Sequence, residues 1–175
     1  MSHWNLKSTA ILAQMAMGLL ILARAGTGIA NQVPKEPIKW VLKANLPDKP
    51  LKPGEKFTLE LTAAIESGWH LYAQEQEEGG PTPTRINMPS EQPFEQAGTI
   101  ESSEPKVAMD PNFNLVTQYY EGQATFMIPA RVAVAAAAGK SEAKVNVSFQ
   151  TCNDELCLPP RTVKLAVDVN LATAH

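Results

Sequence analysis

The sequence predicts an all-β protein, an antiparallel β-sandwich that is immunoglobulin-like in the broad sense. Several segments alternate apolar and polar side chains with a period of two, and turn-forming residues recur about every 8–12 residues. No stretch of useful length has the periodicity of an amphipathic helix. Short strands at this spacing are typical of two packed antiparallel sheets. With 175 residues and 44% hydrophobic composition, one domain is expected.

The expected strands are separated by segments rich in proline, glycine or acidic residues. Residues 102–118 are expected to be irregular, because they contain Pro105, Pro111 and several asparagines. The alanines at 135–138 favour a helix by propensity, but the run is short and meets Gly139, so the end of a strand and a turn are expected. In chain order, the expected strands are 38–43, 57–65, 69–73, 84–88, 94–100 (the weakest), 124–134, 145–149 and 163–169.

Residues 1–30 have the composition of an export signal. Lys7 precedes an apolar stretch over 10–23, and small residues then offer cleavage after Ala25 or Ala30. An uncleaved anchor is the alternative, but the apolar stretch is shorter than the roughly 20 residues a spanning helix needs. The expected organisation is a signal peptide over 1–30, a flexible lead-in over 31–37, one domain over 38–170 and a tail over 171–175.

Charge argues against one class of partner. The formal net charge is −3 and the basic side chains form no run, so a nucleic-acid partner is not expected. No cofactor and no metal are expected, and the chain is expected to be monomeric. Export would place the cysteines where disulfides form and persist.

The chain contains two cysteines, Cys152 and Cys157, with four residues between them. They lie at a junction between two alternating segments. Side chains facing each other across such a junction have Cβ atoms about 4.5–5.5 Å apart, within reach of a disulfide's mean of roughly 3.8 Å. A reversible Cys152–Cys157 bridge is therefore the central hypothesis.

Three functions are open to this pair. A structural bridge closing so small a ring stabilises by about 2 kcal/mol, against about 4.7 kcal/mol for a 100-residue loop. A zinc site lacks further ligands, since beyond the signal only His70 and His175 remain as histidines. Thiol–disulfide exchange needs an accessible sulfur and a second cysteine that resolves the mixed disulfide. From chemistry alone, the structural bridge and the exchange pair are about equally favoured.

Several segments together resemble a known family. Phe149-Gln-Thr-Cys152-Asn-Asp-Glu-Leu-Cys157-Leu-Pro-Pro160 is similar to the active-site segment of the N-terminal periplasmic domain of the thiol:disulfide interchange protein DsbD, the disulfide bond corrector domain. The supporting segments are Gly68-Trp-His-Leu-Tyr72, Gly80-Pro-Thr-Pro83 and Tyr119-Tyr-Glu-Gly122 before Ala124-Thr-Phe126. The similarity extends over roughly 38–169.

The resemblance implies an immunoglobulin-like fold and a periplasmic component of a thiol:disulfide oxidoreductase system of the Gram-negative type. Electrons would pass from a membrane-embedded donor, through Cys152 and Cys157, to periplasmic thioredoxin-like oxidoreductases, including those of cytochrome c biogenesis. The resemblance assigns the partner's attack to Cys157. It assigns an aromatic cap to Phe113, and we add Tyr120 as a shielding residue, with His70, Asp154 and Glu155 as candidate neighbours of the site.

Two departures from the family matter. The best-known member has five residues between the cysteines, whereas this chain has four. Full-length DsbD continues into a membrane domain and a thioredoxin-like domain, so electron transfer here would need a separate donor unless the chain is a fragment.

Asp154 and Glu155 would raise the pKa of the thiols, which argues against a strongly oxidising pair. The runner-up function is a non-enzymatic periplasmic binding module with a structural disulfide.

Overall fold

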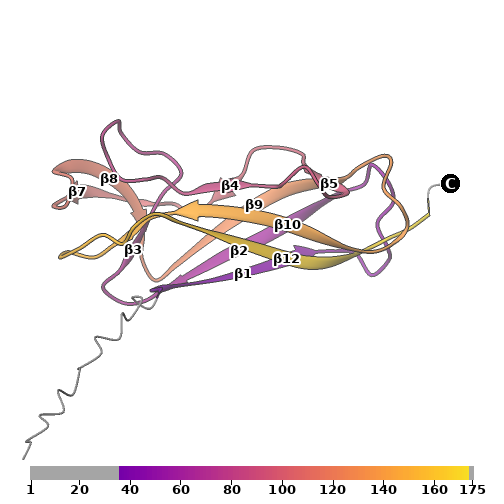
Figure 1. Cartoon of the computed structure of the whole chain (residues 1–175), viewed down its shortest axis with the longest axis horizontal. Helices are drawn as coiled ribbons and strands as arrows, with labels where there is room; N and C mark the ends of the chain where they lie inside the picture. Colours follow the sequence, from indigo (N-terminus) through magenta and orange to yellow (C-terminus); the bar gives the residue numbers. More distant parts are fainter. Residues whose placement is uncertain (1–35, 174–175) are drawn as a thin grey trace, which may run out of the picture. The chain divides into compact units, whose positions relative to one another are not determined.

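The computed structural model describes residues 36–173, which form antiparallel strands and no helix (Figure 1). The expected export signal, nearly all of the lead-in and the end of the tail lie outside these residues. No segment within 36–173 is a helix long and apolar enough to cross a membrane. Every pairing between the named strands of this part is antiparallel. The predicted all-β, immunoglobulin-like class is confirmed.

The first sheet has the order β1-β2-β9-β5, with β6 also paired to β9. Its two long central strands bury every second side chain, because alternate residues of a strand point to opposite faces. The strands are β1 (Ile38–Asn45), β2 (Lys56–Ile65), β5 (Phe94–Gln96), β6 (Glu101–Ser102) and β9 (Gln123–Val132).

The second sheet has the order β12-β10-β4 and packs against the first. Its strands are β4 (Arg85–Asn87), β10 (Gly139–Phe149) and β12 (Arg161–Leu171). All 11 residues of β10 pair with β12. Trp40 of the first sheet lies with its ring 5.2 Å from Phe149 and 6.2 Å from Phe126, measured between centroids. The core therefore lies between the two sheets.

A third, smaller sheet carries the cysteine segment and has the order β11-β3-β8-β7. It consists of β3 (His70–Tyr72), β7 (Lys106–Asp110), β8 (Leu115–Tyr120) and β11 (Thr151–Cys152). In Figure 1 the β7–β8 hairpin and the loop between β10 and β12 gather at the left end of the described domain.

The prediction that 102–118 is irregular was wrong, because this segment holds the end of β6, all of β7 and most of β8. The alternation of the β7–β8 hairpin is inverted. Val107 and Met109 are exposed at 64% and 62%, whereas Asp110 and Thr117 are buried at 3% and 1%. A search for apolar residues on a buried face therefore passes over it.

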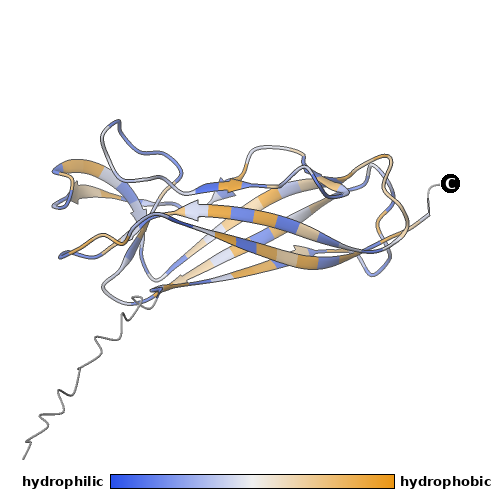
Figure 2. Ribbon diagram, viewed as in Figure 1, coloured by the Kyte–Doolittle hydropathy of each residue, from blue (hydrophilic) through white to orange (hydrophobic). Residues whose placement is uncertain are grey.

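Elsewhere the expected strands are present with shifted ends. The turn expected after the 124–134 segment is present at 133–138, and β10 begins at Gly139 rather than at 145. Strand 94–100 is divided into β5 and a loop. Figure 2 shows the apolar and polar bands alternating along the long strands, which places one apolar face of each sheet toward the core.

Candidate active site

Cys152 and Cys157 form a disulfide with an S–S distance of 2.00 Å. Their backbones face each other as an antiparallel bridge, so the pair closes the base of a small loop. The two cysteines differ in access, because Cys152 is fully buried while Cys157 is partly exposed. A thiolate approaching from solvent therefore meets Cys157 first.

The loop between the cysteines is held in shape by Asn153. The Oδ1 atom of Asn153 accepts hydrogen bonds from the backbone N–H groups of Glu155 and Leu156, at 2.9 and 2.8 Å. Its own N–H donates to the carbonyl of Leu156, also at 2.9 Å. Asparagine favours such local turns because its side chain substitutes for backbone partners. The loop is thus compact, with the side chains of Asp154 and Glu155 exposed.

The cysteine segment is attached to the domain through β3. Thr151 pairs with Leu71, and Cys152 pairs with His70. Residues directly opposite each other in an antiparallel ladder project from the same face. Thr151 and Leu71 therefore face the core, while Cys152 and His70 share the other face of the third sheet.

That other face has a buried polar centre. The hydroxyl of Tyr72 donates to Oδ2 of Asp110 at 2.6 Å, and both residues are buried. The backbone N–H of Asn112 donates to Oδ1 of Asp110 at 2.8 Å. Burial, together with the hydrogen bond to Asp110, raises the pKa of Tyr72, so its hydroxyl stays protonated. One carboxylate thus connects β3 to the turn of the β7–β8 hairpin.

The turn of this hairpin lies against the cysteine loop. The side-chain Nδ2 of Asn112 donates to the carbonyl of Asn153 at 3.0 Å. The ring of Phe113 packs edge-on against Tyr72, with 5.9 Å between centroids. Asn114 has a φ of 53°, a left-handed conformation that asparagine tolerates better than most residues. The structure therefore brings Phe113 to the end of the domain that carries the disulfide.

His70 completes the polar face. Its Nε2 atom lies 3.1 Å from the Tyr72 hydroxyl. Because Tyr72 gives its one proton to Asp110, Nε2 of His70 must donate in this bond. Burial lowers the pKa of His70, and the carboxylates of Asp110, Glu121 and Asp154 raise it in part. The imidazole is therefore neutral at neutral pH.

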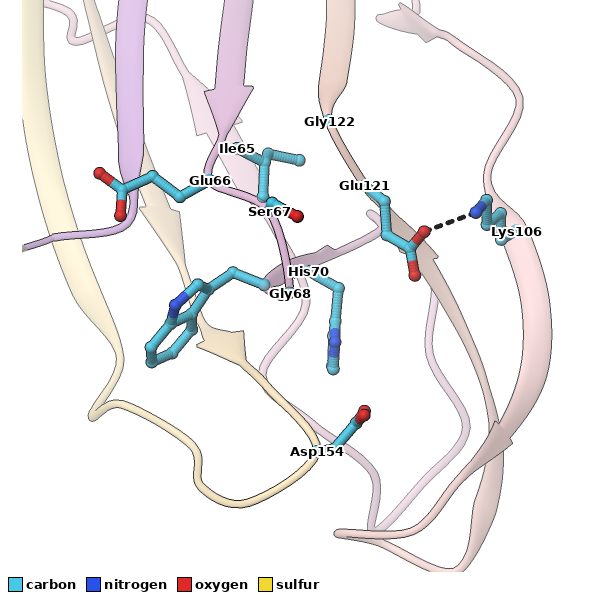
Figure 3. A pocket seen from close by; sticks show the side chains of 10 residues that line it. Ile65, Glu66, Ser67, Gly68, His70, Lys106, Glu121, Gly122 and Asp154 are labelled. Atoms are coloured by element: carbon cyan, nitrogen blue, oxygen red, sulfur yellow. Dashed lines mark hydrogen bonds and ion pairs between the residues drawn. The ribbon is translucent and has the colours of Figure 1, made fainter.

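An open cleft of about 540 Å³ lies beside His70 (Figure 3). In that view the ring of His70 lies beside the carboxylate of Asp154, and Lys106 forms an ion pair with Glu121 at 2.5 Å. The lining residues come from the end of β2, the turn that follows it, the start of β3, β7, the turn after β8 and the cysteine loop. The cleft gives solvent access to the polar face next to Cys152.

Tyr120 is not brought to the cysteines. It is 4% exposed and packs in the core, with its ring 5.6 Å from Phe126 and its hydroxyl donating to Ser102 at 2.9 Å. Its neighbour Tyr119 lies instead on the His70 face, with 5.0 Å between ring centroids. Alternate residues of a strand point to opposite faces, so Tyr119, and not Tyr120, lies on the face of the third sheet that carries Cys152 and His70.

Of the other residues named from the sequence, Asp154 lines the cleft and Glu155 contributes only a backbone hydrogen bond. Sequence reasoning missed Tyr72 and Asp110. The Asp-Pro-Asn sequence of the turn was the available signal for Asp110, because aspartate often begins a turn. Nothing local indicated that this carboxylate is buried.

Comparison with known proteins identifies one family. The family model for the thiol:disulfide interchange protein DsbD, N-terminal, matches residues 43–168. No curated protein sequence matches the chain. Among solved structures, the reduced DsbD N-terminal domain of Neisseria meningitidis is 16% identical, with a TM-score of 0.46 over 64% of this chain and 77% of its own.

Two further solved structures are similar at the same low level. The N-terminal periplasmic domain of ScsB from Proteus mirabilis is 15% identical, with a TM-score of 0.49 over 78% of this chain and 47% of its own. A family 123 glycoside hydrolase from Clostridium perfringens is 10% identical, with a TM-score of 0.37 over 78% of this chain and 28% of its own. The family assignment rests on the sequence model, which covers most of the chain.

Proposed function

Because the chain belongs to the family of DsbD N-terminal domains, we propose that it exchanges electrons with partner proteins through Cys152 and Cys157. The observation that carries this proposal is the unequal burial of a disulfide in a short loop. Cys157 is accessible to a partner, and the buried Cys152 acts as the resolving residue. An exchange protein needs one cysteine that a partner can attack and a second cysteine that resolves the mixed disulfide, whereas a structural bridge needs neither.

The proposed reaction has two steps in each direction. A donor thiolate attacks Sγ of Cys157, the Cys152–Cys157 bond breaks, and Cys152 leaves with the electron pair. The donor's second thiolate then attacks its own sulfur in the mixed disulfide and releases Cys157, which leaves the domain with two thiols and the donor with a disulfide. A client disulfide is reduced by the reverse sequence: Cys157 attacks it, and Cys152 then attacks Sγ of Cys157 to release the client.

We propose that Phe113 and the turn around it limit access to the disulfide. The turn is attached to the cysteine loop by the Asn112–Asn153 hydrogen bond and to Tyr72 by an edge-on aromatic contact. Contacts of this kind contribute about 0.5–1.5 kcal/mol each, so a docking protein can displace them at small cost. Small thiols, which gain no docking energy, would meet the closed turn.

The place and partners of the reaction are also proposals. Residues 1–30 would direct the chain to the periplasm and be removed after Ala25 or Ala30, leaving a lead-in and the domain over 38–170. The donor would be a membrane protein of the DsbD type acting in trans, and the clients would be periplasmic thioredoxin-like oxidoreductases.

The reduction potential of Cys152–Cys157 in the purified domain, equilibrated against glutathione, tests the function. A value between about −200 and −270 mV, in the range of known exchange proteins, is expected. The variant with both cysteines changed to alanine should remain folded, losing about 2 kcal/mol of stability and all exchange activity. A potential well below about −300 mV, with unfolding on reduction, would leave a structural disulfide in a binding module.

A further inference from the structure

We infer that His70 is the acid–base partner of Cys152, an inference that rests on the exchange function proposed above. His70 takes the proton of the Cys152 thiol when Cys152 attacks. It returns a proton when Cys152 leaves the disulfide. The inference stands on the pairing of β11 with β3 and on the cleft beside them.

Cys152 needs such a partner because it is fully buried. The thiolate is the nucleophile in disulfide exchange, and removal from water disfavours this charged form. Cys157 is partly exposed and can exchange its proton with water. The requirement for a local base therefore falls on Cys152 alone.

The fold brings the base to this sulfur from a distant part of the chain. Cys152 and His70 are direct cross-strand partners, so their Cβ atoms lie about 4.5–5.5 Å apart on one face of the sheet. A cysteine sulfur and an imidazole nitrogen carried on Cβ atoms at this separation are within reach of each other. His70 is the only histidine among residues 36–173.

The hydrogen bonds of His70 leave its Nδ1 atom available to accept a proton. Nε2 donates to the hydroxyl of Tyr72, so the neutral ring carries its lone pair on Nδ1. Asp110 lies 3.8 Å from Nε2 and favours the imidazolium that forms when Nδ1 accepts a proton. The cleft then allows this proton to exchange with solvent. The titratable groups facing the ring are Tyr72, Lys106, Asp110, Tyr119, Glu121 and Asp154.

The step is balanced in both directions. During release of a client, Nδ1 of His70 takes the Cys152 proton, and the thiolate attacks Sγ of Cys157. The bond from Cys157 to the client breaks, and the client sulfur leaves with the electron pair. During reduction of the domain, a donor thiolate attacks Cys157 and Cys152 leaves as a thiolate, while Nδ1 of His70 takes a proton from the solvent in the cleft and passes it to Cys152. Protons enter and leave through the solvent in the cleft.

The test uses the reduced domain and the disulfide reagent 5,5′-dithiobis(2-nitrobenzoate), which releases a coloured anion in two phases. In the first phase Cys157 attacks the reagent, and in the second Cys152 displaces the remaining anion from Cys157. His70→Gln keeps a side-chain N–H that can donate to Tyr72 but has no basic nitrogen. We expect the second phase to slow by roughly 100-fold at pH 7, as for loss of a general base, with the first phase unchanged.

The pH profile separates this role from a structural one. The wild-type rate of the second phase should rise through two ionisations, first that of His70 and then that of the thiol. The His70→Gln rate should rise through the thiol alone. Equal second phases in the two proteins, or a wild-type profile with only the thiol ionisation, would overturn the role of His70 and leave the exchange function intact.

The pH profile of the second phase in the wild-type domain tests the role of His70 even if the variant folds poorly. A wild-type domain that releases only the first anion would overturn the exchange function and the inference together. The unchanged first phase serves as the internal control, because it depends on Cys157 and on a folded loop. These outcomes distinguish failure of the inference from failure of the function on which it rests.

Discussion

The body of the sandwich and the end that carries the cysteines are built on different principles. The body buries apolar side chains from β2, β9 and β10, with Leu59, Leu61 and Phe126 fully enclosed. The cysteine end buries a tyrosine hydroxyl on a carboxylate, Tyr72 on Asp110, and places a histidine beside them. Apolar packing gives stability without direction, whereas hydrogen bonds fix particular atoms in place. Stability and chemistry are therefore separable in this domain.

The largest effect that tests this separation is expected from Phe126→Ala. Phe126 is fully buried and contacts Trp40 and Tyr120, so the variant should lose about 3–5 kcal/mol of unfolding free energy, measured by urea denaturation. The reduction potential of the molecules that remain folded should not change. Val134→Ala, at a side chain that is 81% exposed, is the control and should stay within about 0.5 kcal/mol of the parent.

Asp110→Ala should have the next largest effect, and it should reach the disulfide. The variant loses a charge-assisted hydrogen bond from Tyr72 and the bond that shapes the turn, at a cost of about 1.5–3 kcal/mol. The turn should then move, and reduction of the disulfide by dithiothreitol should become faster. Asp168→Ala removes an exposed ion pair with Lys140 and should change neither quantity measurably. An unchanged reduction rate in Asp110→Ala would show that the turn does not restrict access.

Phe113→Ala should change the rate of reduction more than the stability. The lost ring contact with Tyr72 corresponds to about 0.5–1.5 kcal/mol, which would raise the population of open turns, and the rate with dithiothreitol, roughly 2- to 10-fold. The control is Val116→Ala, which removes a half-exposed side chain from the outer face of the same hairpin. Equal rates in the two variants would contradict a shielding role for Phe113.

The smallest expected effect is a pH dependence of stability in the oxidised domain. Burial lowers the pKa of His70 in the folded state, so the unfolded chain binds its proton first as the pH falls. The stabilisation is therefore complete above the ordinary histidine pKa near 6.5 and is lost as the pH falls through and below it. The stability of the parent relative to His70→Gln should decline between pH 7 and pH 5 in urea titrations. A constant difference would mean that the proton affinity of His70 is the same in the folded and unfolded states.

The sequence predicted the body better than the cysteine end, for a physical reason. In the segment 57–65 every second side chain is apolar, which predicts a strand with one buried face, and the structure has this strand at Lys56–Ile65. The β7–β8 hairpin buries Asp110 and Thr117 and exposes Val107 and Met109, so the same rule gave no strand there.

The composition of the site was partly predictable, but its pairing was not. The two cysteines were identified from local sequence, Phe113 was assigned by the family resemblance, and the bridge expected between the cysteines is present. The juxtaposition of His70 with Cys152 depends on β11 adding to β3, which lies some 80 residues earlier in the chain. Neither strand is long enough to specify its partner by pattern. Tertiary packing, rather than local preference, makes this choice.

The last pair of the long β10–β12 ladder, Phe149 with Arg161, stands directly outside the cysteine segment. Residues 150–160 are therefore the tip of a hairpin whose stem is already fixed. Hairpin tips accept insertions and deletions more readily than the strands they join. One residue more or fewer between the cysteines changes the size of the disulfide ring and leaves the register of the stem untouched. The residues between the cysteines can therefore change in number without a change in the β10–β12 register, whereas Thr151 and Cys152 remain fixed by their pairing with β3.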